Sequence, residues 1–374
     1  MSKIPGTVGA VIQEDTVFFQ YPNEWGHSIM KALVLESQMN CVVQEVATPT
    51  PGDNDILVKI MANGVCRSDW HVWEAEVNNY PSKILGHEFT GIVEEVGKNV
   101  TRFKKGDRVI APFSGSEGTC PQCQQGHTNI CDSFLLPGFM YPGGFAEYVS
   151  IPFGERNLVL LPEEISFVDG AALGCRFMTA FHGVVDQVKV LPGEWVAVFG
   201  CGGVGLSAIN IATAIGANVI GVDINDANLE LAKQMGAAYT VNSKQTDPVA
   251  AIREVTNGGA HVSIDALGYT QTCVSGIRSL RKRGRHLQVG LTTNHEQGHI
   301  AIPVNEMILK EINFITTLGM PAHRFDSLLP LVTTGRLTPG KMVTREIALS
   351  EVNDIFTAMS SYSNTGTFVV TKFS

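Results

Sequence analysis

Three short segments in the first half of the chain carry side chains that bind metals well. Cys66 lies in Gly-Val-Cys-Arg-Ser-Asp-Trp-His, His87 in Gly-His-Glu, and Cys175 follows Leu-Gly. Two thiolates and one imidazole would leave the fourth tetrahedral position of a zinc ion open, as catalytic zinc requires. Each residue alone is weak evidence, because a single cysteine is more often a small buried hydrophobe and the histidine could be a turn residue.

Three further cysteines, Cys120, Cys123 and Cys131, fall within twelve residues of one another. In a chain of 374 residues such clustering favours metal binding over disulfides. The same cysteine usage predicts a reducing, cytoplasmic location.

A glycine-rich loop directly follows the apolar strand expected at 195–199. Its motif residues are Gly200, Gly202, Gly203, Val204 and Gly205. A helical pattern begins at Leu206, so the motif has the strand, turn and helix context of a dinucleotide site. Gly200 would permit the turn, Gly202 the approach of a pyrophosphate, and Gly205 close helix–strand packing. The helix N-terminus would then offer N–H groups to the phosphates.

Asp223 ends the next expected strand, 18 residues beyond Gly205. A carboxylate there can bind both ribose hydroxyls of NAD and would repel the 2′-phosphate of NADP. Ile224 and Asn225 follow, with no cation to receive that phosphate. We therefore predict NAD; the alternative is that Asp223 only shapes the turn or caps the next helix.

The elements that must position these residues change in character along the chain. Residues 31–175 hold short runs rich in valine and isoleucine between turn residues, which predicts strands. After about residue 185, strand-like runs alternate with helical patterns, which predicts a parallel sheet with helices on both faces. After about residue 320 the pattern of the first part returns, so we expect the C-terminal segment to rejoin that domain.

The composition of the chain argues against several classes of function. The hydrophobic share of 44% and charged share of 17% are those of an ordinary globular protein. A net charge of -9 argues against a nucleic-acid partner. The one dense basic run, at 278–285, is expected to be a solvated helix end that stops near Gly284. No segment reaches the roughly 18 apolar residues of a membrane span, and no secretory signal is visible.

The ordered combination of these motifs resembles the zinc-containing alcohol dehydrogenases of the medium-chain dehydrogenase family over residues 30–374. The resemblance implies an α/β protein with two domains. A GroES-like, β-rich catalytic domain would comprise 30–184 and 321–374, and a Rossmann NAD-binding domain with a doubly wound parallel sheet would comprise 185–320. Residues 1–29 match nothing and form an extension of unknown role.

The resemblance also implies roles at the matching positions. Cys66, His87 and Cys175 would bind the catalytic zinc, and Asp69 would orient His87. Glu88 would lie beside the metal, near enough to modulate it or bind it transiently.

Other matching residues would serve the substrate and the cofactor. Ser68 would receive the proton of the alcohol, and His71 would pass it to solvent, since an imidazole exchanges protons near neutral pH. Arg67 would pair with the pyrophosphate, and the backbone from Val289 to Leu291 would hold the carboxamide of the nicotinamide. The alternatives are a local turn hydroxyl for Ser68 and a surface histidine for His71.

The chain departs from the family pattern in three places. The cysteine-rich lobe usually carries four cysteines, but Glu117 stands at the first position, so we predict a structural zinc bound by Glu117, Cys120, Cys123 and Cys131. The alternative is a metal-free loop with Glu117 in solvent. Arg176 stands where small residues are common. Thr367 stands where many relatives have an arginine that helps bind the pyrophosphate. Arg67 or Arg176 is a candidate to replace that arginine in binding the cofactor.

The substrate is expected to be a primary or secondary alcohol, or its aldehyde or ketone. Phe113 and Trp73 are the pocket candidates, although each aromatic could be ordinary core. A polyol dehydrogenase is the nearest alternative, opposed by Cys175 where many of those enzymes have glutamate. Zinc-free quinone reductases should lack the ligand set, and a non-enzymatic binding protein should have lost a ligand or the glycine loop.

The family forms dimers or tetramers through the edge of the nucleotide-domain sheet. The short interval from Cys131 to Cys175 lacks the long insertion of the dimeric animal enzymes. A homotetramer is therefore expected rather than a dimer.

Overall fold

The structure is a computed structural model that describes residues 25–75, 80–292, 296–361 and 364–373. Within them, residues 179–318 and 336–338 form one compact unit, and the remainder forms a second. The predicted boundaries after residues 184 and 320 lie close to these divisions. Of the predicted extension 1–29, residues 1–24 lie outside the described chain, and strand β1 (Trp25–Ser37) begins five residues before the predicted start at Met30.

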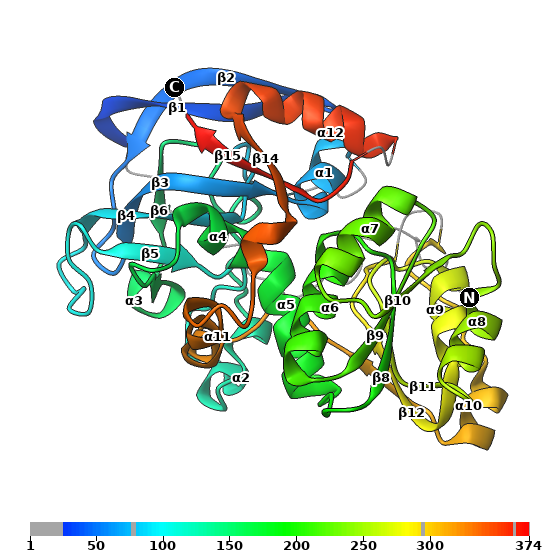
Figure 1. Ribbon diagram of the computed structural model, residues 1–374. Helices are drawn as coiled ribbons and strands as arrows, with labels where there is room; N and C mark the ends of the chain where they lie inside the picture. The colour runs from blue at the N-terminus through cyan, green and yellow to red at the C-terminus, as the bar shows by residue number, and fades with distance from the viewer. Residues whose placement is uncertain (1–24, 76–79, 293–295, 362–363, 374) are drawn as a thin grey trace, which may run out of the picture. The chain divides into compact units, whose positions relative to one another are not determined.

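The smaller unit contains a six-stranded parallel sheet (Figure 1). Its strands are β8 (Trp195–Phe199), β9 (Asn218–Asp223), β10 (Tyr239–Asn242), β11 (Ala260–Asp265), β12 (Leu280–Gln288) and β13 (Asn313–Thr316). Their spatial order is β10-β9-β8-β11-β12-β13, which is the Rossmann order. The fold predicted for this part of the chain is therefore confirmed.

Five helices connect these strands. They are α6 (Gly203–Ile215), α7 (Asp226–Gln234), α8 (Pro248–Val255), α9 (Thr270–Arg278) and α10 (Val304–Lys310). Helices α6 and α7 lie on one face of the sheet, and α8 and α9 on the other (Figure 1). Their ends follow local rules: Asn225 and Asp247 cap α7 and α8 through their side chains, and Gly216 ends α6 with φ +97°.

The basic run at 278–285 is not a helix end near Gly284, so that expectation was wrong. Helix α9 stops at Arg278, and β12 already begins at Leu280. Leu280 pairs with Ala260 and Arg285 pairs with Val262, so the residues between them form a bulge in the strand. The helical pattern was misread because the bulge interrupts the alternation of side chains.

The larger unit is built on a mixed, mainly antiparallel sheet in the order β14-β15-β3-β4-β5-β7, with β6 also paired to β3. A separate hairpin joins β1 to β2. The strands are β2 (Asn40–Pro49), β3 (Ile56–Val65), β4 (Glu88–Val96), β5 (Arg108–Ala111), β6 (Tyr148–Ile151), β7 (Val159–Leu160), β14 (Val343–Ala348) and β15 (Thr367–Lys372). This is the predicted β-rich, GroES-like part, completed by the C-terminal strands.

Short helices fill the remaining connections of the chain. The α-helices are α1 (Arg67–Trp73), α2 (Pro121–Gln124), α3 (Gly154–Asn157), α4 (Phe167–Ala172), α5 (Met178–Phe181), α11 (Phe325–Thr333) and α12 (Val352–Ser360). The 3₁₀ turns are η2 (Thr128–Ile130), η6 (Ala322–Arg324), η7 (Pro339–Met342) and η8 (Leu349–Glu351), and the π-helical turns are η3 (Leu173–Phe177) and η4 (His182–Gln187). Among the described helices, none has both the length and the apolar character that crossing a membrane requires.

Candidate functional site

The three predicted metal ligands of the larger unit come together. Cys66 directly follows β3, and His87 directly precedes β4. Because Gly64 of β3 pairs with Glu88 of β4, the strand register makes Cys66 and His87 neighbours. Cys175 arrives from η3, and one ligand atom from each of these three residues and from Glu88 lies within 4.8 Å of the others.

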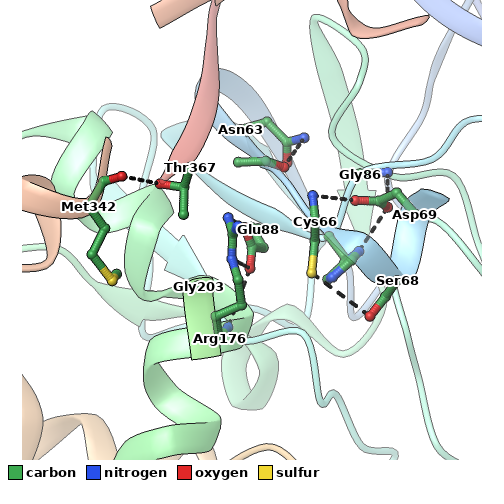
Figure 2. A network of polar contacts seen from close by, with 12 residues as sticks. Asn63, Cys66, Ser68, Asp69, Gly86, Glu88, Arg176, Gly203, Met342 and Thr367 are labelled. Carbon is green, nitrogen blue, oxygen red and sulfur yellow. Dashed lines mark hydrogen bonds and ion pairs between the residues drawn. The ribbon is translucent and has the colours of Figure 1, made fainter. Parts of the chain in front are cut away.

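A single buried carboxylate joins the segments that carry Cys66 and His87. Asp69 accepts hydrogen bonds from the backbone N of Cys66 (3.2 Å) and the backbone N of Gly86 (3.0 Å) (Figure 2). It also accepts from Nδ1 of His87 at 2.9 Å. Asp69 is fully buried. A carboxylate accepts only, so Nδ1 of His87 carries a proton. Burial lowers the pKa of this imidazole, but Asp69 and Cys66 outweigh burial and raise it well above its usual value. Nε2 is the nitrogen left for a metal, which would displace any proton there on binding. This is the orienting position predicted for Asp69.

The remaining nitrogen of His87 supports the fit of a metal ion. Nε2 is buried and has no hydrogen-bond partner among the residues that the structure describes. A buried polar nitrogen without a partner is costly, and metal coordination is one of the few ways to satisfy it. Two thiols close to an imidazole whose other nitrogen is held by a carboxylate form a donor set that suits zinc.

The two thiols differ in their acidity. A hydrogen bond from Cys175, and His87 nearby, hold the pKa of Cys66 well below its usual value, although burial opposes this shift. The same hydrogen bond and burial raise the pKa of Cys175. One proton shared between two neighbouring sulfurs gives this pattern, and a divalent cation would displace it.

Glu88 is fully buried beside the cluster and forms an ion pair with Arg176 (Figure 2). Nε of Arg176 donates to Oε1 at 2.9 Å, Nη2 donates to Oε2, and the backbone N of Arg176 donates to Oε1 at 3.3 Å. Burial raises the pKa of Glu88, while the guanidinium opposes this. Arg176, considered from the sequence as a phosphate partner, is thus engaged by Glu88; this pair was missed because its members are 88 residues apart.

The predicted relay and phosphate residues lie on the short helix α1. Ser68 Oγ is 3.8 Å from Cys66 Sγ, and His71 follows one helical turn later on the same face. The guanidinium of Arg67 stacks over the ring of Trp70 at 4.6 Å and donates to the carbonyl of Met359 at 3.1 Å. The helix therefore holds Ser68 next to the ligand cluster.

The two pocket candidates lie in different surroundings. The ring of Phe113 lies 6.0 Å from that of His87, edge to face, and Phe139 lies 5.5 Å from the same imidazole. Trp73 is instead 1% exposed, packs on Phe356, and donates from Nε1 to Asn353 at 2.9 Å. We interpret Trp73 as a core residue, because its polar atom and its ring are both satisfied there.

The second cysteine group is also assembled. The ligand atoms of Cys120, Cys123 and Cys131 lie within 4.8 Å of one another. Oε1 of Glu117 lies 3.9 Å from Sγ of Cys131 and accepts from the backbone N of Cys120 at 3.1 Å. Oε2 accepts from Thr119 Oγ1. The glutamate thus lies beside Cys131, but its carboxylate is not within 4.8 Å of all three sulfurs.

In the smaller unit, the glycine loop has the geometry expected of a phosphate cradle. Gly200 has φ +90°, where a side chain is strained. A methyl group added to Gly205 would meet the carbonyl oxygen of Gly200 at 1.7 Å, whereas one added to Gly202 would have no neighbour within 4 Å. Gly203 begins α6, with Val204 in its first turn. The loop is therefore tight on its inner side and open at Gly202.

The carboxylate of Asp223 ends β9 and holds the adjacent turns. Oδ2 accepts from the backbone N of Cys201 in the glycine loop at 2.7 Å. Oδ1 accepts from the backbone N of Ile224 at 2.8 Å and of Asn225 at 2.9 Å. Asn225, and not Asp223, caps α7. Asp223 thus connects the two loops at the carboxyl edge of the sheet, where ligands bind in such folds.

Asp265 is a buried residue at the same edge that sequence reasoning missed. Its carbonyl accepts from the backbone N of Val289 (3.0 Å) and Gly290 (2.9 Å), which anchors the segment predicted to hold the nicotinamide. Leu291, at the end of that segment, is 77% exposed. The sequence did contain a signal for this role, because an aspartate at the end of a buried strand commonly accepts hydrogen bonds from the loop that follows.

Comparisons with known proteins agree with this arrangement. Residues 52–163 match the model of the alcohol dehydrogenase GroES-like domain, and residues 203–334 match the zinc-binding dehydrogenase model. An NAD-dependent alcohol dehydrogenase of Sulfurisphaera tokodaii is 34% identical over 337 residues, which cover 87% of this chain and 94% of the relative.

Two further similarities extend over nearly the same length. A sorbitol dehydrogenase of Halalkalibacterium halodurans is 31% identical over 338 residues, covering 89% of this chain and 96% of the relative. The solved structure of the alcohol dehydrogenase TADH from Thermus sp. ATN1 superimposes with a TM-score of 0.85 at 30% identity, covering 92% of this chain and all of that one. Two matching family models, these relatives and the assembled cysteine–histidine site lead to one conclusion: the chain belongs to the zinc-containing alcohol dehydrogenases of the medium-chain family, oxidoreductases that use zinc and a nicotinamide dinucleotide.

Proposed function

We propose that this protein oxidises a primary or secondary alcohol with NAD, and reduces the aldehyde or ketone in reverse, as an alcohol dehydrogenase of class EC 1.1.1.1. The observation that carries the proposal is Nε2 of His87, which is buried beside two thiols without a hydrogen-bond partner among the described residues. Cys66, His87 and Cys175 would hold the zinc. Bound there, zinc supplies Lewis acidity toward the alcohol oxygen, and NAD accepts the hydride.

The protein's own groups would bind and move the proton. Ser68 Oγ, next to Cys66, would accept the hydrogen bond of the substrate hydroxyl, and His71, one turn along α1, would return the proton to solvent. Asp69 would hold the proton of His87 on Nδ1 and so leave Nε2 as the nitrogen that binds the metal. Phe113, edge-on to His87, would form an apolar wall of the substrate site.

The preference for NAD is proposed from Asp223. Its carboxylate is fixed at the end of β9 by backbone N–H groups, so it is placed to accept from ribose hydroxyls and to repel a 2′-phosphate. The open side of Gly202 and the first turn of α6, with Gly203 and Val204, would receive the pyrophosphate, together with Arg67. The segment Val289–Leu291 would hold the carboxamide.

The decisive experiment measures NAD and NADP reduction across a panel of alcohols on protein whose metal has been counted. We expect NAD-linked activity that is lost on chelation and restored by zinc. Cys175→Ala should lower both the zinc content and the activity. Cys41→Ala is the matched control, because Cys41 is also a buried free thiol but lies outside both cysteine clusters.

The alternatives predict other outcomes. A polyol dehydrogenase would prefer sorbitol or a vicinal diol to simple alcohols in the same panel. A binding protein would retain zinc and bind NADH but reduce neither cofactor with any alcohol. Full activity in protein free of zinc would contradict the proposal and favour the zinc-free branch of the fold.

A second, structural zinc is proposed at Glu117, Cys120, Cys123 and Cys131, supported by the three converging thiols and the adjacent carboxylate. We expect two zinc ions per chain in the parent and one in Glu117→Ala. Glu117→Cys should keep two, because a thiolate restores a four-sulfur site. Two zinc ions in Glu117→Ala would show that the carboxylate is not a required ligand.

Assembly and location are proposed on separate grounds. Edge strand β13 is largely exposed, and α10 presents Val304, Ile308 and Leu309 to solvent, which suits a homo-oligomeric contact. We propose a homotetramer, and a catalytic role for the larger unit and an NAD-binding role for the smaller. All eight cysteines are free in the structure, which suits a reducing, cytoplasmic compartment.

A further inference from the structure

The carboxylate of Glu88 is close enough to join the proposed metal site, yet both its oxygens are bound by another residue. One of its oxygens lies within 4.8 Å of the ligand atoms of Cys66, His87 and Cys175. Arg176 nevertheless supplies donors to both: Nε and the backbone N to Oε1, and Nη2 to Oε2 (Figure 2). The same four side chains could therefore coordinate a metal in two ways, with or without the carboxylate of Glu88.

The two ways of coordination have different chemical consequences. A metal bound by two thiolates, an imidazole and the carboxylate would be closed, like a structural zinc. A metal bound only by Cys66, His87 and Cys175 keeps one position for a small ligand. The partner of Glu88 thus decides whether the site is open.

The packing around the pair favours the arrangement with Arg176. Glu88 is fully buried, and Arg176 is 8% exposed. A methyl group on Gly64 would come within 2.4 Å of Oε2 of Glu88, and one on Gly174 within 2.8 Å of the Glu88 Cα. Gly64 therefore makes room for the ion pair, and Gly174 makes room for the backbone that carries Glu88. If Arg176 lost its charge, the buried carboxylate would need another cation, and the metal is the nearest candidate.

We propose that Arg176 is a positioning residue that binds both oxygens of Glu88 and keeps this carboxylate out of the metal's coordination shell. The proposal rests on the proposed function, because it requires metal at Cys66, His87 and Cys175. It assigns a task to an arginine that the sequence only marked as unusual. Arg176 would act through Glu88 without touching the substrate.

The test replaces zinc with Co²⁺ in the full chain and follows the visible absorption of the metal during titration with imidazole. In the parent, imidazole should bind the open position. In Arg176→Gln, the released carboxylate should take that position, so the spectrum should change before imidazole is added and the Kd for imidazole should rise roughly ten- to hundred-fold. The double variant Arg176→Gln/Glu88→Gln should regain the parental spectrum and Kd, and Arg176→Lys should lie between.

Three results would overturn the proposal. One is a parental spectrum and Kd in Arg176→Gln. The second is an altered Co²⁺ spectrum in Glu88→Gln alone, which would identify Glu88 as a ligand already; this comparison stands even if Arg176→Gln fails to fold. The third is a parent whose Co²⁺ uptake is unaffected by Cys66→Ser, which would contradict the proposed metal site itself and remove the basis of the inference.

Discussion

At the scale of single residues, the site depends on carboxylates that fix the groups around them. Asp69 makes His87 a donor at Nδ1, and Asp223 gathers backbone N–H groups from two loops. Asp69 is fully buried and Asp223 is half-buried, so few other partners compete for the groups that they bind. Their substitutions should therefore change one property each, which makes them good tests.

Asp223→Asn should weaken NAD binding while the protein stays folded. The amide oxygen can replace one acceptor, but the charge that favours ribose hydroxyls and repels a 2′-phosphate is lost. Hydrogen bonds to charged groups contribute about 1.5–3 kcal/mol, so the KM for NAD should rise roughly ten- to hundred-fold. The KM for NADP should rise less or fall. Steady-state kinetics with both cofactors measures this, and an unchanged NAD-to-NADP ratio would reassign Asp223 to the turn alone.

His286 makes stability sensitive to acid. It is fully buried, faces Ser263 Oγ at 2.8 Å and Gln288 Oε1 at 3.3 Å, and burial lowers its pKa to about 4. Below the unfolded-state value of about 6.5, the unfolded chain gains a proton that the folded protein does not yet bind. The free energy of unfolding should therefore fall as the pH drops from 6.5 toward 4, by about 2 kcal/mol at pH 5.

Urea unfolding at pH 7.5 and pH 5.0 measures this contribution. In His286→Gln, which keeps polar atoms at the site and has no charge to gain, the pH-dependent loss should be smaller by that amount. Any acid-induced release of metal occurs in both proteins and cancels in the comparison. Equal losses in parent and variant would show that His286 is not the group responsible.

At the scale of elements, the glycine loop separates two tasks that the motif alone does not distinguish. Gly205 packs against the carbonyl of Gly200, whereas Gly202 faces open space. Gly205→Ala should therefore destabilise the protein, by about 1–3 kcal/mol as for other overpacked sites. Gly202→Ala should keep the parental melting temperature but raise the Kd for NADH roughly ten-fold, because its methyl group would meet the pyrophosphate.

Thermal unfolding and NADH fluorescence titration on the two variants check this contrast, with each variant serving as the control of the other. Two variants with equal stability and equal NADH affinity would contradict the division of tasks. Loss of stability in Gly202→Ala would mean that the open space is filled by the protein itself.

Elements could be predicted from the sequence where the residues that determine them lie close together in the chain. Patterns of only a few residues predict the strand before Gly200 and the helix after it. The ligand segments at Cys66 and Cys175 are predicted in the same way. The bulge in β12 could not be predicted, because the partner strand decides where extra residues are tolerated. The pair of Glu88 with Arg176 and the core position of Trp73 likewise depend on contacts between distant segments, which a single sequence does not contain.

At the scale of the whole molecule, the edge of the parallel sheet at β13 remains to be explained. Strand β13 ends the parallel sheet with its outer side unpaired among the described strands, and Phe314 on it is 37% exposed. An unpaired edge beside apolar side chains favours pairing with another chain. Ile308→Lys, on α10, should therefore shift the protein to a smaller assembly in light scattering after gel filtration. Leu191→Lys, at a 57% exposed position before β8, is the control and should keep the parental mass. An unchanged mass in Ile308→Lys would exclude this face as the contact.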